Sequence, residues 1–330
     1  MEVGPGPLRI QVVSDGRAGM ENQALGLAEA VARLTPAEIT VRRVRWRAGF
    51  DALPVGLKAP WMLDPAGDAP FPAGGEPWPD LWIATGRATL PLSLAVRRLS
   101  RGRTFVVQTQ DPRQDPALFD LVVAPAHDGL SGPNVVTITG SPHRITPGRL
   151  AEAAPAFSAR LDPVPHPRVA VLIGGRSRAF DLQEDHAAAL AGRIAQTVMA
   201  AGGSALVTFS RRTPEAARTA MTEALAGVPG WIWDGEGPNP LFAFLAAADH
   251  VLVTEDSANM AAEAASTGKP VHVLPMVARK APGKFARLHA DLGARGVTRP
   301  FDGTLPDWTY PPLTETRRAA QAVLEAMARR

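Results

Sequence analysis

The chain has 330 residues, of which 45% are hydrophobic and 20% are charged, the proportions of a folded globular protein. Its length suits two domains of ordinary size better than one core. The net charge of +3 comes without a long run of basic and aromatic residues, which argues against nucleic acid as a partner. Because there is no cysteine, disulfides, thiol catalysis and thiolate metal sites are excluded.

The N-terminal sequence MEVGPGPLRIQVVSDG lacks a basic segment followed by an apolar one, so we expect no signal peptide. The most apolar stretch, LFAFLAAADHVLV, is interrupted by Asp249 and His250 and is too short to span a bilayer. We therefore expect a cytoplasmic protein with no transmembrane segment, and peripheral membrane contact stays open. The preference for arginine over lysine is typical of a GC-rich bacterial genome, and it also suits capture of phosphate or carboxylate.

The first half of the chain alternates short apolar strands with amphipathic segments. Strands are predicted at 9–15, 38–44, 80–86, 104–110, 120–125 and 135–140, with helices at 22–34 and 90–100. The Pro- and Gly-rich region 51–79 is interpreted as an excursion from this domain.

The second half repeats the pattern. Strands are predicted at 168–175, 204–210, 230–235, 250–256 and 270–276, with helices at 184–200, 213–226, 239–248 and 313–330. Apolar strands alternating with helices indicate parallel sheets, and the prolines of 158–169 interrupt the pattern. The sequence thus predicts an α/β protein of two Rossmann-like domains, 1–160 and 161–330, whose sheets face an interdomain cleft.

Polar residues follow the strands of the second half where a ligand of a parallel sheet would bind. Two glycines before a helix allow a close backbone approach and offer amides to an anion, and arginines follow the next strand. In VTEDSANMAAE (253–263), capping alone would explain Asp256 and Ser257. It does not explain Glu255, nor Glu263 two turns into an alanine-rich helix, where an unpaired carboxylate is costly.

A carboxylate pair beside a helix N-terminus repels phosphate but accepts well from sugar hydroxyls. We therefore expect a nucleotide sugar, with its diphosphate at the amides near Ser257, its sugar at Glu255 and its ribose at Glu263. The predicted binding residues of this half are Gly174, Gly175, Arg176, Ser177, Ser210, Arg211, Arg212, Asp256, Ser257, Asn259, Met260 and Glu263. Glu255 is also a candidate catalytic residue.

The strand ends of the first half supply the acceptor side of the predicted site. Its binding residues are predicted to be Gly16, Arg17, Asn22, Gln23, Gly86, Arg87, Gln110 and Asp111. Asp15 and His127 are the candidates for the base that activates the acceptor, although a lone histidine is more often structural. The loop lacks a G-x-G-x-x-G fingerprint, so no NAD is expected. The seven histidines show no H-x3-H or H-E-x-x-H spacing, so neither a metal nor another cofactor is expected.

The spacing of Glu255 and Glu263 resembles the E-x7-E pattern of retaining glycosyltransferases of the GT-B fold. The motifs SDGRAGMENQ, IATGR, QDPR, IGGRSR, TFSRRT and TEDSANMAAEA…GKPV together resemble the mitochondrial-fission "elongated mitochondria" family over about residues 9–313. This resemblance implies a GT-B-like fold whose last helix, about 313–330, returns to the first domain. It also implies a bacterial member of a family with a plant protein in mitochondrial division.

The leading hypothesis is therefore a retaining, metal-independent glycosyltransferase-like enzyme with a nucleotide-sugar donor and an unknown acceptor. Epimerisation of the same donor is a neighbouring possibility. The alternative is that the protein is not an enzyme but a scaffold with a GT-B fold that recruits a protein partner.

Overall fold

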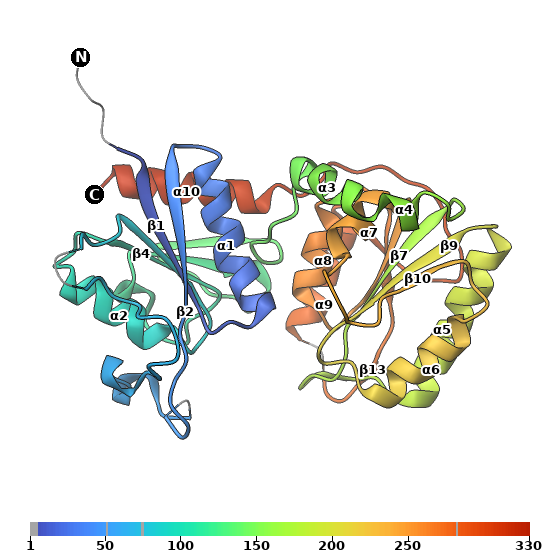
Figure 1. Ribbon diagram of the computed structural model, residues 1–330, viewed down its shortest axis with the longest axis horizontal. Coiled ribbons are helices and arrows are strands. Elements are labelled where there is room, and N and C mark those ends of the chain that lie inside the picture. The colour runs from blue at the N-terminus through green and yellow to red at the C-terminus, as the bar shows by residue number, and fades with distance from the viewer. Residues whose placement is uncertain (1–5, 51, 74–75, 282) are drawn as a thin grey trace, which may run out of the picture. The chain divides into compact units, whose positions relative to one another are not determined.

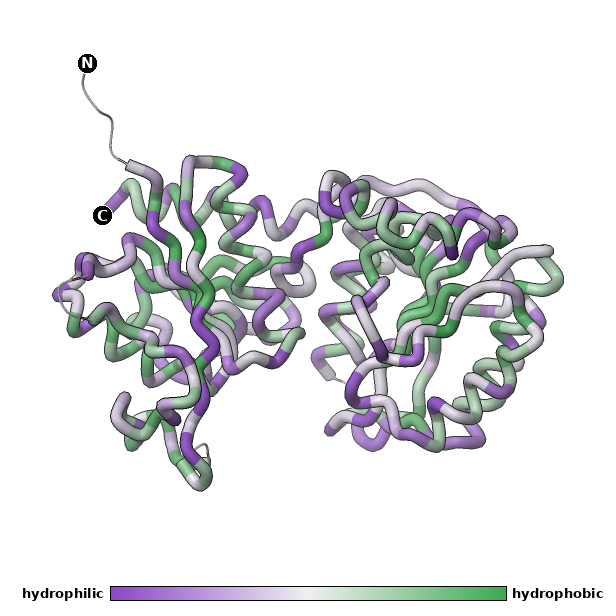
Figure 2. The backbone as a smooth tube through the Cα atoms, in the orientation of Figure 1, coloured by the Kyte–Doolittle hydropathy of each residue, from purple (hydrophilic) through white to green (hydrophobic). Residues whose placement is uncertain are grey.

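The computed structural model describes residues 6–50, 52–73, 76–281 and 283–330. They form two compact units (Figure 1). The first unit contains the described residues up to Arg144 together with Thr314–Arg330, and the second unit is Ile145–Leu313. In each, the hydrophobic strands lie at the centre and hydrophilic residues at the periphery (Figure 2).

The first unit is built on a parallel sheet with the strand order β2-β1-β3-β4-β5-β6. The strands are β1 (Leu8–Ser14), β2 (Ala37–Arg43), β3 (Leu81–Thr85), β4 (Phe105–Thr109), β5 (Leu121–Pro125) and β6 (Val135–Ile138). Its helices are α1 (Ala18–Ala32), α2 (Leu90–Leu99) and α10 (Glu315–Ala328), with short 3-10 turns η1 (Val55–Leu57), η2 (Pro60–Met62), η3 (Pro116–Leu118) and η4 (Ala126–Asp128).

Alternation along the strands supplies both faces of this sheet. Ile83 packs with α1 and α10 on one face, and Trp82 packs with α2 on the other. The last helix belongs to this unit because Ala320 and Val323 are fully buried in its core. The hydroxyl of Thr316 also accepts a hydrogen bond from the His143 amide (3.2 Å).

The second unit is built on a parallel sheet with the order β10-β9-β7-β11-β12-β14. The strands are β7 (Arg168–Ile173), β9 (Ser204–Phe209), β10 (Gly230–Ile232), β11 (His250–Thr254), β12 (Val271–Leu274) and β14 (Thr298–Pro300), and β8 (Phe180–Asp181) pairs with β13 (Val277–Ala278). The helices are α3 (Pro147–Ala153), α4 (Ser158–Leu161), α5 (Glu184–Ala200), α6 (Glu215–Leu225), α7 (Leu241–Ala247), α8 (Ala258–Ala265) and α9 (Lys284–Ala294), with a 3-10 turn η5 (Ala154–Phe157).

The strand order of each sheet reverses direction at one point, between β1 and β3 in the first unit and between β7 and β11 in the second. In open parallel sheets a ligand binds at the carboxyl ends of the strands beside such a reversal. The loops after β7 and β11 are the glycine-rich stretch and the VTEDSANMAAE stretch. The topology therefore brings the two most informative motifs of the second half to one edge.

The segment before β7 differs from the sequence-based expectation, which put the domain boundary at 160 and saw no helix at 158–169. The second unit instead starts at Ile145, and Ser158–Leu161 is helical. Leu161 is buried in the second unit, and the Phe157 ring packs against Trp231 with centroids 5.7 Å apart. These tertiary contacts, rather than a periodic pattern, fix the segment.

Candidate functional site

The glycine loop after β7 is tied directly to the end of β11. The Gly174 amide donates to the hydroxyl of Thr254 (2.7 Å), and the Gly175 amide donates to the Asp256 carboxylate (3.1 Å). A Cβ at Gly174 would lie 1.9 Å from Asp256 Oδ1, and one at Gly175 would lie 2.1 Å from the Arg212 carbonyl oxygen. Both positions therefore need glycine because neighbouring groups occupy the space of a side chain.

Asp256 connects the loop after β7, the loop after β9 and the end of β11. Its side chain is fully buried and pairs with Arg212 Nη2 at 2.7 Å. It also accepts from the Thr254 hydroxyl (2.7 Å) as well as from the Gly175 amide. These three donors hold the buried carboxylate in place, so Asp256 positions the loops on either side of it. That it also binds substrate stays a prediction. The cap of α8 is Ser257, whose hydroxyl accepts from the Met260 amide (3.4 Å).

Two serine hydroxyls at this edge accept hydrogen bonds from backbone amides of their own loops. Ser177 Oγ accepts from the amides of Ala179 (3.2 Å) and Phe180 (3.0 Å). Ser210 Oγ accepts from the Arg212 amide (3.1 Å). The sequence predicted Ser177 and Ser210 as binding residues, and the structure gives both hydroxyls a role in the turns.

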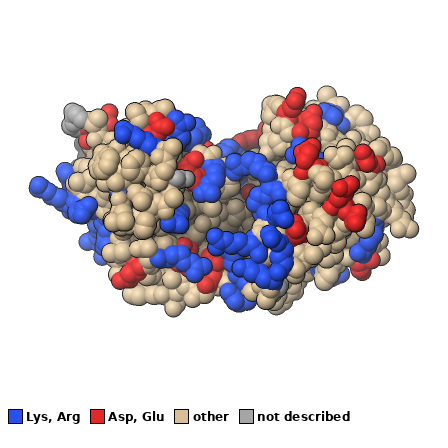
Figure 3. All heavy atoms as spheres, turned by 90° about the horizontal axis from the view of Figure 1, so that it is seen from below, with Lys and Arg blue, Asp and Glu red and all other residues tan. Residues whose placement is uncertain are grey.

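Basic side chains surround the same edge. Arg178, Arg211, Arg279 and Lys280 are exposed, as is Arg176, which lies 3.4 Å from Asp181. Figure 3 shows a concentration of Lys and Arg atoms on the face that it presents. Such a rim attracts anionic ligands by adding to the positive potential of a helix N-terminus.

Glu255 is half-buried and anchored from two sides. Its Oε1 accepts from the Met276 amide (2.6 Å), and its carbonyl oxygen accepts from His289 Nε2 (2.9 Å). The side chain is thereby held at the start of α8. Asn259 and Met260, in the first turn of α8, are also half-buried.

Glu263 is the unusual residue of the site. It is 7% exposed among the alanines of α8, and within the described residues its carboxylate has neither a hydrogen bond nor an ion pair. Burial raises its pKa to about 7. A buried acid without a partner is costly to a fold, and such residues gather at functional sites. Sequence reasoning singled it out, while the role of Thr254 as a link between the two loops was missed.

The first unit places its predicted residues at the corresponding reversal. The Asp15 carboxylate pairs with its neighbour Arg17 (2.7 Å to Nε), which must give way before Asp15 accepts a proton from an acceptor. Gln110 Nε2 donates to Gln23 Oε1 (2.9 Å), which links the residue after β4 to α1. Gln110 also has a left-handed backbone, φ +68°.

The other residues predicted to form the site of the first unit differ in how exposed they are. Gly86 and Asn22 are half-buried, Gly16 and Arg87 are exposed, and Asp111 pairs with Arg113 (3.0 Å). His127 is 6% exposed in η4, which does not favour it as a base for an incoming acceptor.

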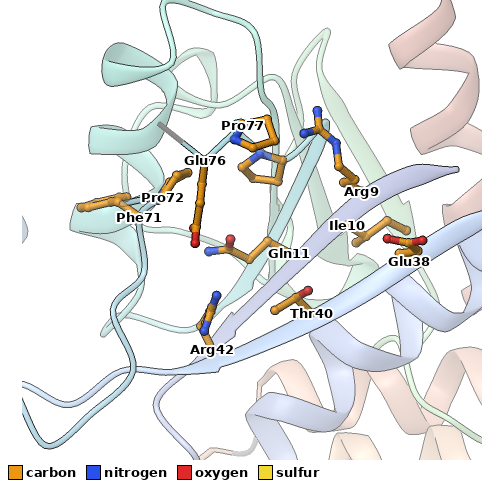
Figure 4. Close-up of a pocket in the computed structure, with 11 residues that line it drawn as sticks. Arg9, Ile10, Gln11, Glu38, Thr40, Arg42, Phe71, Pro72, Glu76 and Pro77 are labelled. Carbon is orange, nitrogen blue, oxygen red and sulfur yellow. The ribbon is translucent and has the colours of Figure 1, made fainter. Parts of the chain in front are cut away.

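A separate pocket of about 230 Å³ lies along β1 and β2 beside residues 71–72 and 76–79 (Figure 4). Two of its polar side chains are hydrogen-bonded. Arg9 donates twice to Asp80 (2.7 and 3.1 Å), and Gln11 Nε2 donates to the Pro70 carbonyl oxygen (2.5 Å). This pocket lies along the strands rather than at their carboxyl ends, so it is not the candidate site.

Two kinds of feature are absent from the ranges that the structure describes. No three side chains of His, Asp or Glu converge there as a metal ion would require. No helix in those ranges has the length and apolar character that crossing a membrane needs.

Comparison with known proteins gives a family match. The model of the family described as mitochondrial fission ELM1 matches residues 18–327. The mitochondrial fission protein ELM1 of Arabidopsis thaliana is 33% identical over 279 residues, which are 76% of this chain and 65% of that protein. The chain thus matches slightly less than two thirds of that relative.

Comparison with solved structures identifies the fold. A putative UDP-N-acetylglucosamine 2-epimerase from Listeria monocytogenes aligns with a TM-score of 0.51 and 13% identity, over 98% of this chain and 91% of that one. The UDP-N-acetylglucosamine 2-epimerase of Rickettsia bellii aligns with a TM-score of 0.50 and 12% identity, over 98% and 95%. The chain has an α/β fold of the GT-B-like kind, with two parallel sheets.

Proposed function

Because the chain belongs to the mitochondrial fission ELM1 family and has a GT-B-like fold, we propose that its second unit binds a nucleotide sugar and that the protein transfers the glycosyl group. The observation that carries the proposal is Glu263, a buried carboxylate without a partner in the described part of the chain, on the helix that starts at the sheet reversal. A ribose supplies two neighbouring hydroxyl donors, which are what this acceptor lacks.

The remaining parts of the donor have matching groups. The first amides of α8 have no helical acceptor and lie near the arginine rim, which suits a diphosphate. Glu255, held by the Met276 amide, has a second carboxylate oxygen for a sugar hydroxyl. In this proposal Glu263 binds the ribose, Glu255 binds the sugar, and the α8 amides and the arginines bind the diphosphate.

In the transfer, the bond between the sugar C1 and the diphosphate oxygen breaks, and the leaving diphosphate takes the electron pair. The acceptor hydroxyl forms a new bond to C1 and loses its proton. The α8 amides and the arginines stabilise the negative charge that develops on the diphosphate, so the proposal includes no metal. A retaining course follows from the resemblance of Glu255 and Glu263 to E-x7-E. The sequence-based candidate for the base that takes the acceptor's proton is Asp15, since His127 is buried.

Epimerisation of the same donor is a second candidate, since the two structural neighbours above are named for UDP-N-acetylglucosamine. UDP-N-acetylglucosamine is for that reason the first donor to examine. Proton NMR of the sugar after incubation separates the two reactions. Epimerisation needs no acceptor and changes the configuration at C2, whereas transfer needs an acceptor and releases UDP.

The binding step is tested by calorimetric titration with UDP-N-acetylglucosamine and other nucleotide sugars. Glu263→Gln removes a charged acceptor, so donor affinity should fall about 10- to 100-fold, which corresponds to ~1.5–3 kcal/mol. Glu223, exposed on α6, supplies the matched control Glu223→Gln, for which affinity should not change. The proposal is wrong if no nucleotide sugar binds the wild-type protein or if Glu263→Gln binds it equally well.

A further inference from the structure

Exposed apolar side chains are concentrated in one part of the first unit. Of the six large hydrophobic side chains that are exposed within the described ranges, four lie on or beside the excursion and α2. Leu57 and Trp61 are 64% and 65% exposed, and Leu99 and Leu118 are 50% and 41% exposed. Single exposed hydrophobic residues are ordinary, but a concentration of them in one region is typical of a contact site.

Leu118 lines a groove of about 500 Å³ between the excursion and α2, and the other three side chains each follow a residue that lines it. Val55 and Pro60 line it on one side, Leu94 lines it on the other, and Leu118 closes it. Trp61 packs edge-on against Phe50, with ring centroids 5.9 Å apart, and still exposes most of its surface. Figure 1 shows the two short turns projecting from the first unit near α2.

The charges around the groove have one sign. Lys58, Arg97 and Arg98 line it, and no acidic residue is among the described residues that do. Lys58 Nζ lies 4.9 Å from the Trp46 ring centroid, and Arg97 also pairs with Asp120 (3.3 Å). Arg98 is exposed at the end of α2. This surface combines positive charge with exposed apolar side chains. A partner that offers negative charge beside an apolar layer would therefore complement it.

We propose that Leu57, Trp61, Arg97 and Arg98, which we call the docking patch, bind the first unit to the surface of an anionic lipid bilayer. Tryptophan favours the boundary between headgroups and acyl chains, where its ring is buried and its N–H stays hydrated. Leucine adds apolar area beside it, and the arginines contact the headgroup phosphates. Since the patch contains none of the residues proposed to bind the donor, this inference is independent of the proposed function.

Sedimentation of the full chain with vesicles tests the proposal. Vesicles of phosphatidylcholine with phosphatidylglycerol should bind the protein at low salt, vesicles of phosphatidylcholine alone should bind it weakly, and added salt should release it. The double variant Leu57→Ser/Trp61→Ser should lower the partition coefficient about tenfold or more. Arg98→Glu should lower it at least about fivefold.

Controls come from surfaces outside the patch. Met199 is 53% exposed on α5, so Met199→Ser removes another exposed apolar side chain, and Arg329→Glu reverses a charge that lies outside the docking patch. Both should bind vesicles like the wild type, and thermal melting checks that every variant folds. The proposal is overturned if the wild-type protein does not bind anionic vesicles, or if the double variant binds them as well as the wild type does. A dimer that the double variant loses, without vesicle binding, also overturns it and assigns the groove to a second copy of the chain.

Discussion

Glu263 links the stability of the second unit to the proposed binding of a donor. The sequence left two possibilities, a side chain facing solvent in an empty site or one buried against an arginine. The structure corresponds to neither, because the side chain is buried and, within the described residues, unpaired. Its cost to the fold is therefore present until a ligand supplies donors.

This cost depends on pH in a direction that can be predicted. The folded-state pKa of Glu263 is raised from 4.5 to about 7. Below pH 4.5 the group is protonated in both states, and as pH rises to 7 the unfolded chain ionises first, so stability falls and stays lower above pH 7. Glu263→Gln should thus raise the unfolding free energy by about 2–3 kcal/mol at pH 8 and change it little at pH 4.5.

Thermal or urea unfolding of the two proteins at both pH values measures this difference, with Glu223→Gln as the control. A variant less stable than the wild type at pH 8 would mean that Glu263 has a stabilising partner. The same ionisation should favour donor binding, since ribose hydroxyls donate best to the charged form.

At the scale of elements, the loop after β7 leaves no space for a side chain at Gly174. Gly174→Ala places a methyl group on the Asp256 carboxylate, so the loop or the α8 start must shift. We expect donor affinity to fall at least about tenfold, because a displacement of about 1 Å misplaces the anion-binding amides. Gly192→Ala is the matched control. Gly192 is exposed on α5, and a methyl group there would meet no neighbouring group within 4 Å, so this change should stabilise the protein by about 0.5–1 kcal/mol and leave affinity unchanged.

Calorimetry and melting of the two alanine variants distinguish these effects. If Gly174→Ala binds the donor like the wild type, the loop does not belong to the site.

The elements also show which structures the sequence could predict. Strands such as Val169–Ile173 are continuous apolar runs, so their existence and the parallel sheets follow from pattern alone. The strand β14 is only Thr298–Pro300, too short for a pattern, and its place is set by pairing with β12. The β8–β13 pair is fixed by tertiary contacts in the same way.

The candidate site was predictable to a similar degree. Glu263 could be found because a carboxylate among alanines violates the helix pattern. The pairing of the buried Asp256 with Arg212 could not be predicted, because it joins loops 44 residues apart in sequence, and local capping explained Asp256 equally well.

At the scale of the whole molecule, each unit has its own sheet reversal, and we propose that the donor binds at the second. The family and the fold do not by themselves locate a ligand. The proposal therefore depends on the Gly174–Arg178 loop, the Ser210–Thr213 loop and the Glu255–Glu263 segment.

Hydrogen exchange of the full chain with and without a saturating nucleotide sugar tests this assignment most directly. We expect slower exchange at 174–178, 210–213 and 255–263, with the protection reduced in Glu263→Gln at the same donor concentration. Protection confined to 9–11, 38–42, 71–72 and 76–79, the segments around the pocket of the first unit, would contradict the assignment.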